Sequence, residues 1–185
     1  MQAGFNPLPR GVRSGGRTGD LTSSFRLEGY ASLFGVADAG GDMVMAGAFA
    51  RSLARRGASG IRMLFQHDAA QPVGVWDEIR EDGRGLFVRG RLIPGVAKAD
   101  DLMRLIEAGG LDGLSIGFRA LQAQRDARSG IRRLVEIDLW EISIVTFPML
   151  GGARLGAAKS TGPLAVRLER DASHIRSSQR QKRMT

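Results

Sequence analysis

The chain has 185 residues, of which 43% are hydrophobic and 25% charged, and this composition predicts one soluble globular domain with a single core. It contains no cysteine and two histidines, which excludes disulfides and thiol nucleophiles, argues against a metal site and gives no indication of a cofactor. Of the net charge of +8, residues 1–20 carry +2 and residues 164–185 carry +4, so the middle of the chain is nearly balanced. We therefore expect no nucleic-acid partner.

The two ends of the chain differ in composition from the rest. Residues 1–22 are rich in Gly, Ser, Arg and Pro, and residues 157–185 are basic, so we expect both to be flexible. The N-terminus lacks the apolar region of a secretory signal, and no apolar run approaches the roughly 20 residues that cross a bilayer. The sequence therefore predicts a folded domain over residues 23–156, no membrane segment, and a protein that stays in the cytoplasm.

Strand patterns dominate the predicted domain. Alternating apolar residues predict strands in "SSFRLEGYASLFG", in "IRMLFQHD", and on both sides of the turn "EDGRG" at residues 81–85. The strongest strand signal is "IRRLVEIDLWEISIVTFP", which Pro148 closes. We interpret "QAQRDARSG" as a polar connection and "GGARLGAAKSTGP" as a flexible segment of small residues.

Two short helices interrupt these strands. Phe49 and Leu53 lie four residues apart in "DMVMAGAFARSLARRG", where Gly57 ends the helix, and a second helix is predicted over residues 97–108. The chain shows no internal repeat, and the strands do not alternate regularly with long helices. The pattern favours a mainly β domain with helices (α+β class), built as an antiparallel barrel flanked by helices.

Gly113, Ser115 and Gly117 form the pattern G-x-S-x-G, which marks the nucleophilic serine of many hydrolases. In an α/β-hydrolase this serine follows a strand, and its histidine lies later in the chain. Here the preceding segment is predicted to be helical, and the only later histidine, His174, falls in the basic end. A nucleophilic Ser115 would therefore need His67 as its base in another fold. The alternative is that Ser115 caps the exit of the helix.

A base and an acid are found in strand-like segments. In "IRMLFQHD" His67 extends the apolar row of Ile61, Met63 and Phe65, and Glu141 lies in a second row of alternating residues: Val135, Ile137, Leu139, Ser143 and Val145. A buried carboxylate must be paired, and a histidine held by a carboxylate can take a proton from serine. His67 could instead be an edge residue, and Glu141 could pair with Arg132 or Arg133.

Four stretches, in the same order, resemble the prohead maturation proteases of tailed bacteriophages. They cover roughly residues 27–156: "GYASLFGVADAGGDMVMAGAFARSL", "MLFQHDAAQPVGVWDEIREDGRGLFVRGRL", "LMRLIEAGGLDGLSIGF" and "IDLWEISIVTFPMLGGARL". The resemblance implies a herpesvirus-protease-like fold with a closed β-barrel. It also implies that His67 is the general base, Ser115 the nucleophile and Glu141 the acid of a triad.

The resemblance further implies a role in head assembly. Such an enzyme acts as a homo-oligomer inside the procapsid, in the cytoplasm of the bacterial host, where it cuts scaffold or major capsid protein and then itself. The backbone amides of Ile116 and Gly117 are candidate oxyanion-hole donors, because glycine lets the chain approach a substrate carbonyl. The alternative is a catalytically silent scaffold or capsid-binding module with the same fold. A small-ester hydrolase is disfavoured because no histidine follows Ser115 in the predicted domain.

Overall fold

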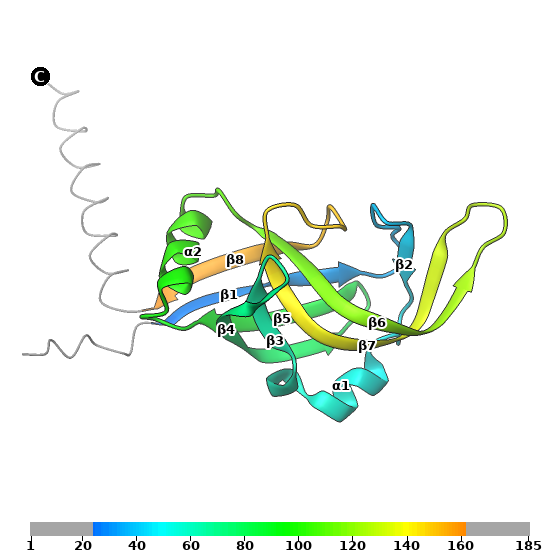
Figure 1. Ribbon diagram of the computed structural model, residues 1–185, viewed down its shortest axis with the longest axis horizontal. Helices are drawn as coiled ribbons and strands as arrows, with labels where there is room; N and C mark the ends of the chain where they lie inside the picture. The colour runs from blue at the N-terminus through cyan, green and yellow to red at the C-terminus, as the bar shows by residue number, and fades with distance from the viewer. Residues whose placement is uncertain (1–23, 162–185) are drawn as a thin grey trace, which may run out of the picture.

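The computed structural model describes residues 24–161, and the predictions for residues 1–22 and 162–185 lie outside this part of the chain. The described residues form eight strands, two α-helices and one short 3₁₀ helix (Figure 1). In chain order they are β1 (Ser24–Leu33), β2 (Asp42–Val44), α1 (Ala50–Arg56), the 3₁₀ helix (Ala58–Gly60), β3 (Arg62–Phe65), β4 (Asp68–Glu81), β5 (Gly85–Leu92), α2 (Ala97–Glu107), β6 (Gly113–Arg125), β7 (Arg132–Val145) and β8 (Arg154–Thr161).

Seven of the strands close into a barrel. The order is β7-β3-β4-β5-β1-β8-β6, and β6 pairs back with β7, while β2 adds to β7 outside the ring. The predicted closed barrel is confirmed, and its neighbouring strands are antiparallel except for β3 and β7, which run parallel. A ring of seven strands cannot alternate direction throughout, so at least one neighbouring pair must be parallel. Closure leaves the barrel strands with few free edges.

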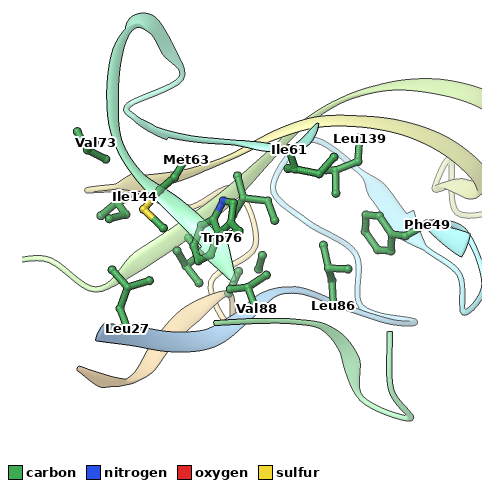
Figure 2. Packing of buried hydrophobic residues seen from close by; sticks show 14 of the residues in the cluster. Leu27, Phe49, Ile61, Met63, Val73, Trp76, Leu86, Val88, Leu139 and Ile144 are labelled. Carbon is green, nitrogen blue, oxygen red and sulfur yellow. The ribbon is translucent and has the colours of Figure 1, made fainter. Parts of the chain in front are cut away.

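Large apolar side chains from all sides of the barrel fill its interior (Figure 2). Leu27, Met63, Val88 and Ile144 come from four different strands, and each is almost completely buried. Phe49 enters from the segment before α1 and is also inaccessible to solvent. Burial of such side chains is the main stabilising contribution to a domain of this size.

Both predicted helices are present, and each lies outside the barrel (Figure 1). α1 ends at Gly57, whose φ of 61° is the left-handed conformation that glycine adopts readily. None of the helices in the described residues is long and apolar enough to cross a membrane.

Two segments that the sequence predicted to be irregular are strands. β6 continues to Arg125 through the residues interpreted as a polar connection, and it forms a long hairpin with β7 that extends beyond the barrel (Figure 1). β8 was predicted as a flexible small-residue segment, and its backbone continues past the predicted boundary at residue 156 to Thr161. β8 pairs with β1 and approaches it so closely that a Cβ on Gly29 would collide with the Arg154 carbonyl.

Candidate active site

Ser115 lies in the barrel wall, near the start of β6. The strand begins at Gly113, so the alternative that Ser115 caps the exit of α2 is wrong. The side chain is largely buried, with a relative exposure of 6%, and Ser115 lies directly opposite Ser143 of β7. Residues opposite each other in an antiparallel pair share one face of the sheet, with Cβ atoms about 5 Å apart.

His67 lies in the turn between β3 and β4, not in a strand. Phe65 pairs with Asp68, which leaves Gln66 and His67 as the two residues of the turn, with φ angles of 54° and 60°. Two consecutive positive φ angles are typical of the type I′ hairpin turn. The prediction that His67 extends the apolar strand row is therefore wrong, because the strand ends at Phe65. The turn presents the imidazole at the end of β3.

The end of β7 anchors this turn. The Gln66 amide donates to the Ile144 carbonyl at 3.1 Å, and the Gln66 side chain donates to Thr146 Oγ1 at 2.7 Å. The His67 amide donates to Ser143 Oγ, also at 3.1 Å. A left-handed conformation costs a non-glycine residue about 1–2 kcal/mol, and hydrogen bonds of this kind offset that cost.

Glu141 lies on the outer face of β7, and the row that placed it among core residues is interrupted. Phe118 pairs with Leu139, whereas its neighbour Gly117 pairs with Glu141, so Trp140 is an extra residue that forms a β-bulge. The bulge reverses the alternation: Leu139 points into the core, and Glu141 points to the opposite face. The prediction of one continuous face through Leu139 and Glu141 is wrong for this reason.

The structure brings His67 and Glu141 into direct contact. His67 Nδ1 lies 2.5 Å from Glu141 Oε1, and the Glu141 side chain is 12% exposed, against 42% for His67. The pKa of His67 is raised above its ordinary value of 6.5. The hydrogen bond to Glu141 is the largest cause; partial burial opposes it, and the charge of the carboxylate adds to it. The predicted alternative that Glu141 pairs with Arg132 is wrong, since Arg132 forms a bidentate pair with Asp42.

Ser143 and Gly117 also contact Glu141, which the sequence did not predict. Ser143 Oγ donates to Glu141 Oε2 at 2.7 Å, so both carboxylate oxygens have a partner. The Glu141 carboxylate lies across Gly117, where a Cβ would come within 2.7 Å of Glu141 Cδ. Gly117 therefore makes room for the acid. Its position opposite a strand carboxylate could have suggested this, but only after the register was known.

A cavity of about 190 Å³ adjoins Ser115. Its apolar lining includes Ile116 and Phe118 from β6 and Met149 from the loop after β7, and Asp38 adds a carboxylate. Among the described residues, no cluster of His, Cys, Asp and Glu side chains could hold a metal ion. The site therefore offers a hydroxyl, an imidazole and a carboxylate on one side of the β6–β7 pair, and Ser115 also lines a cavity.

Residues 16–163 match the profile of the caudovirus prohead serine proteases. The chain belongs to this family. A prohead protease of Enterobacteria phage HK97 is 39% identical over 136 residues, which cover 72% of this chain and 60% of the relative. A prohead protease of Escherichia phage T5 is 29% identical over 73% of this chain and 63% of the relative. The chain thus spans less than two thirds of the length of these relatives.

Two solved protease structures align with this chain. The bacteriophage T4 capsid assembly protease aligns with a TM-score of 0.56 and 18% identity, over 66% of this chain and 82% of that chain. A KSHV protease aligns with a TM-score of 0.49 and 13% identity, over 75% of this chain and 65% of that chain. The likeness to the T4 protease concerns the fold, and it agrees with the predicted barrel flanked by helices.

Proposed function

We propose that this family member is a serine endopeptidase in which His67, Ser115 and Glu141 form a catalytic triad. The observation that carries the proposal is the 2.5 Å hydrogen bond between His67 Nδ1 and Glu141 Oε1, on the face of the β6–β7 pair that also bears Ser115. A carboxylate at Nδ1 fixes the tautomer that leaves Nε2 free to accept a proton, and it stabilises the imidazolium that results.

The chemistry follows from these roles. His67 Nε2 takes the Ser115 hydroxyl proton as Oγ bonds to the scissile carbonyl carbon, and the imidazolium then returns the proton to the leaving amine. An acyl-enzyme remains on Ser115. Water, deprotonated by His67, attacks this ester and releases the carboxylate product, which restores the serine. Glu141 stays ionised throughout and holds the imidazole in place.

The oxyanion donor is proposed to be the Ile116 amide rather than that of Gly117. The Leu114 amide donates to Ala153 of the β7–β8 connection, away from β7. Since amide directions alternate along a strand, the Ile116 amide points to that same edge, where the β6–β8 pairing has ended at Gly113. The Gly117 amide points toward β7 and its ladder. Ile116 also lines the cavity beside Ser115, where a substrate carbonyl would be accommodated.

The proposed substrates are the major capsid protein or scaffold of a virus-like head, followed by the enzyme itself. The two relatives from phages HK97 and T5 are named prohead proteases, which supports a site of action inside the procapsid. We propose that the protein works there as a homo-oligomer. The competing function is a catalytically silent capsid-binding module, for which the three side chains would be dispensable.

Co-expression of the chain with its cognate capsid protein tests the proposal, with mass spectrometry of the capsid protein's N-terminus as the measurement. The wild type should shorten the capsid protein, and Ser115→Ala should leave it intact. A fluorophosphonate probe, which reacts with activated serines, should label the wild type at Ser115 and fail to label Ser115→Ala or His67→Ala. Equal shortening by the wild type and Ser115→Ala would favour the silent module or another protease.

A further inference from the structure

One buried hydroxyl contacts both the acid and the base of the proposed triad. Ser143 is completely inaccessible to solvent, and it lies two residues after Glu141 on the same face of β7, directly opposite Ser115. Serine is usually exposed, and a buried hydroxyl costs free energy unless it is hydrogen-bonded. The partners of Ser143 therefore indicate why a polar side chain is present at this position.

The Ser143 hydroxyl both donates and accepts a hydrogen bond. The hydroxyl proton goes to Glu141 Oε2 at 2.7 Å, and the oxygen accepts the His67 amide at 3.1 Å. A hydroxyl has one donor and two acceptor sites, so these two bonds use its only proton and one of its lone pairs. The bond to a carboxylate is charge-assisted and is the stronger of the two.

These bonds restrict how the triad can move. A carboxylate on a flexible glutamate can rotate about its last torsion, but with Oε2 held by Ser143 its other oxygen, Oε1, remains directed at His67 Nδ1. The bond to the His67 amide holds the left-handed turn against the end of β7. The same hydroxyl thus sets the distance between the backbone that carries the base and the carboxylate that orients it.

We propose that Ser143 is a positioning residue, whose hydroxyl fixes Glu141 and the His67 turn relative to one another. The inference rests on the proposed triad and extends it, because Ser143 acts through these two groups and does not touch the substrate. An alanine at this position would leave the acid and the base in place but free to separate.

The matched control is Ser52, a second buried serine that contacts β7. It is 2% exposed, and its hydroxyl exchanges hydrogen bonds with the backbone of Leu139, on the core side of the bulge. Removing that hydroxyl should destabilise the domain without disturbing the triad. Comparison of Ser143→Ala with Ser52→Ala therefore separates a positioning role from the general effect of losing a buried hydroxyl.

The experiment measures how fast a fluorophosphonate probe labels Ser115 in the full chain. Ser143→Ala should lower the maximal labelling rate about 100-fold, the effect of a roughly 1 Å misplacement in an active site, with little change in the probe concentration that gives half the rate. Ser52→Ala should label at the wild-type rate. Ser143→Cys, which places a slightly larger group with a weaker donor at this position, should fall between the wild type and Ser143→Ala, so the comparison does not depend on Ser143→Ala folding.

Proton NMR gives a second readout that needs no reaction. The His67 Nδ1 proton in its short bond to Glu141 should resonate far downfield in the wild type and in Ser52→Ala, and broaden or vanish in Ser143→Ala. The inference is overturned if Ser143→Ala and Ser143→Cys both label at the wild-type rate and keep this resonance. If the wild type itself is not labelled at Ser115, the proposed function fails, while the resonance still tests the role of Ser143.

Discussion

The two faces of β7 perform different tasks within a few residues of each other. Toward the barrel interior, Leu139, Ile142 and Ile144 are completely buried among apolar neighbours. On the opposite face, Glu141 and Ser143 make polar contacts with each other and with the His67 turn. The inner face stabilises the barrel through apolar burial, and the outer face fixes the position of Glu141 relative to His67.

The β-bulge at Trp140 makes this division possible. Without an extra residue, Glu141 would share a face with Leu139 and point into the core, where an unpaired carboxylate is costly. With the bulge, the carboxylate emerges beside Gly117, which has no side chain to obstruct it. Bulges are frequent next to active sites for this reason: they redirect a side chain without breaking the sheet. Substitutions on the two faces should therefore have separable effects on stability and on activity.

The largest expected effect is on the outer face, at the acid. Glu141→Ala removes the group that orients His67, and we expect the rate of capsid-protein cleavage to fall about 10⁴-fold, as when the acid of a serine triad is lost. The melting temperature should fall only modestly, because the side chain is not part of the core but its loss leaves the buried Ser143 hydroxyl without its acceptor. Glu136→Ala is the control: it removes another β7 carboxylate, paired with Arg51, and should leave cleavage unaltered. Similar losses in the two variants would contradict a specific role for Glu141.

The next effect belongs to the inner face. Ile142→Ala deletes a completely buried side chain between Glu141 and Ser143, and such truncations lower the free energy of unfolding by about 2–5 kcal/mol. Urea denaturation would measure this loss. At temperatures where the variant remains folded, its cleavage rate per folded molecule should stay near that of the wild type. A variant of wild-type stability with impaired cleavage would show that the two faces do not separate as described.

Gly117, on the strand opposite Glu141, tests whether cleavage can be slowed without loss of stability. In Gly117→Ala the new methyl group would collide with the Glu141 carboxylate, whose flexible side chain can move aside at small cost to folding. We expect near wild-type thermal stability and cleavage slowed about 100-fold, since a small displacement of a catalytic group has an effect of this size. A fully active Gly117→Ala would show that the acid tolerates displacement, and would weaken the case for Glu141 as an orienting group.

The sequence predicted the mainly β barrel and the two helices, and it suggested His67, Ser115 and Glu141 as a triad, but the reasoning from alternation misplaced two of these three residues. His67 was assigned to a strand row and lies in a turn, because Gln66 and His67 adopt left-handed angles that non-glycine residues rarely adopt. Glu141 was assigned to the row of Leu139, because a single-residue bulge leaves no mark in hydropathy. The triad hypothesis did not depend on these placements, because the chain has only two histidines able to act as base.

Other features depend on pairing between distant segments and could not be read locally. β8 consists mainly of small residues with weak strand propensity, and it is a strand because β1 pairs along its length, with Gly29 allowing close approach. The far part of β6 looked like a connection because its residues are polar and basic, and β7 holds it through the hairpin. Ser143 carried no signal beyond its position two residues after Glu141, since its role requires the register that brings His67 to it.

The smallest expected effect is a change in the pH dependence of cleavage, which reports the influence of the Glu141 charge on His67. The hydrogen bond to Glu141 raises the pKa of His67 above 6.5, and a protonated imidazole cannot accept the Ser115 proton, so cleavage should rise with pH through a midpoint above 6.5. In Glu141→Gln the carboxylate is lost and only partial burial acts on the imidazole, so the pKa of His67 should fall to 6.5 or below.

NMR titration of the His67 ring measures both values, with Glu136→Gln as the charge-matched control. The same shift affects folding: the pair's contribution to stability should be fully present below pH 6.5 and decline as the pH rises through the raised pKa of His67. In Glu141→Gln this decline should disappear from the pH dependence of unfolding. If the His67 pKa were the same in the wild type and Glu141→Gln, the carboxylate would not control the imidazole, and the proposed triad would lack its acid.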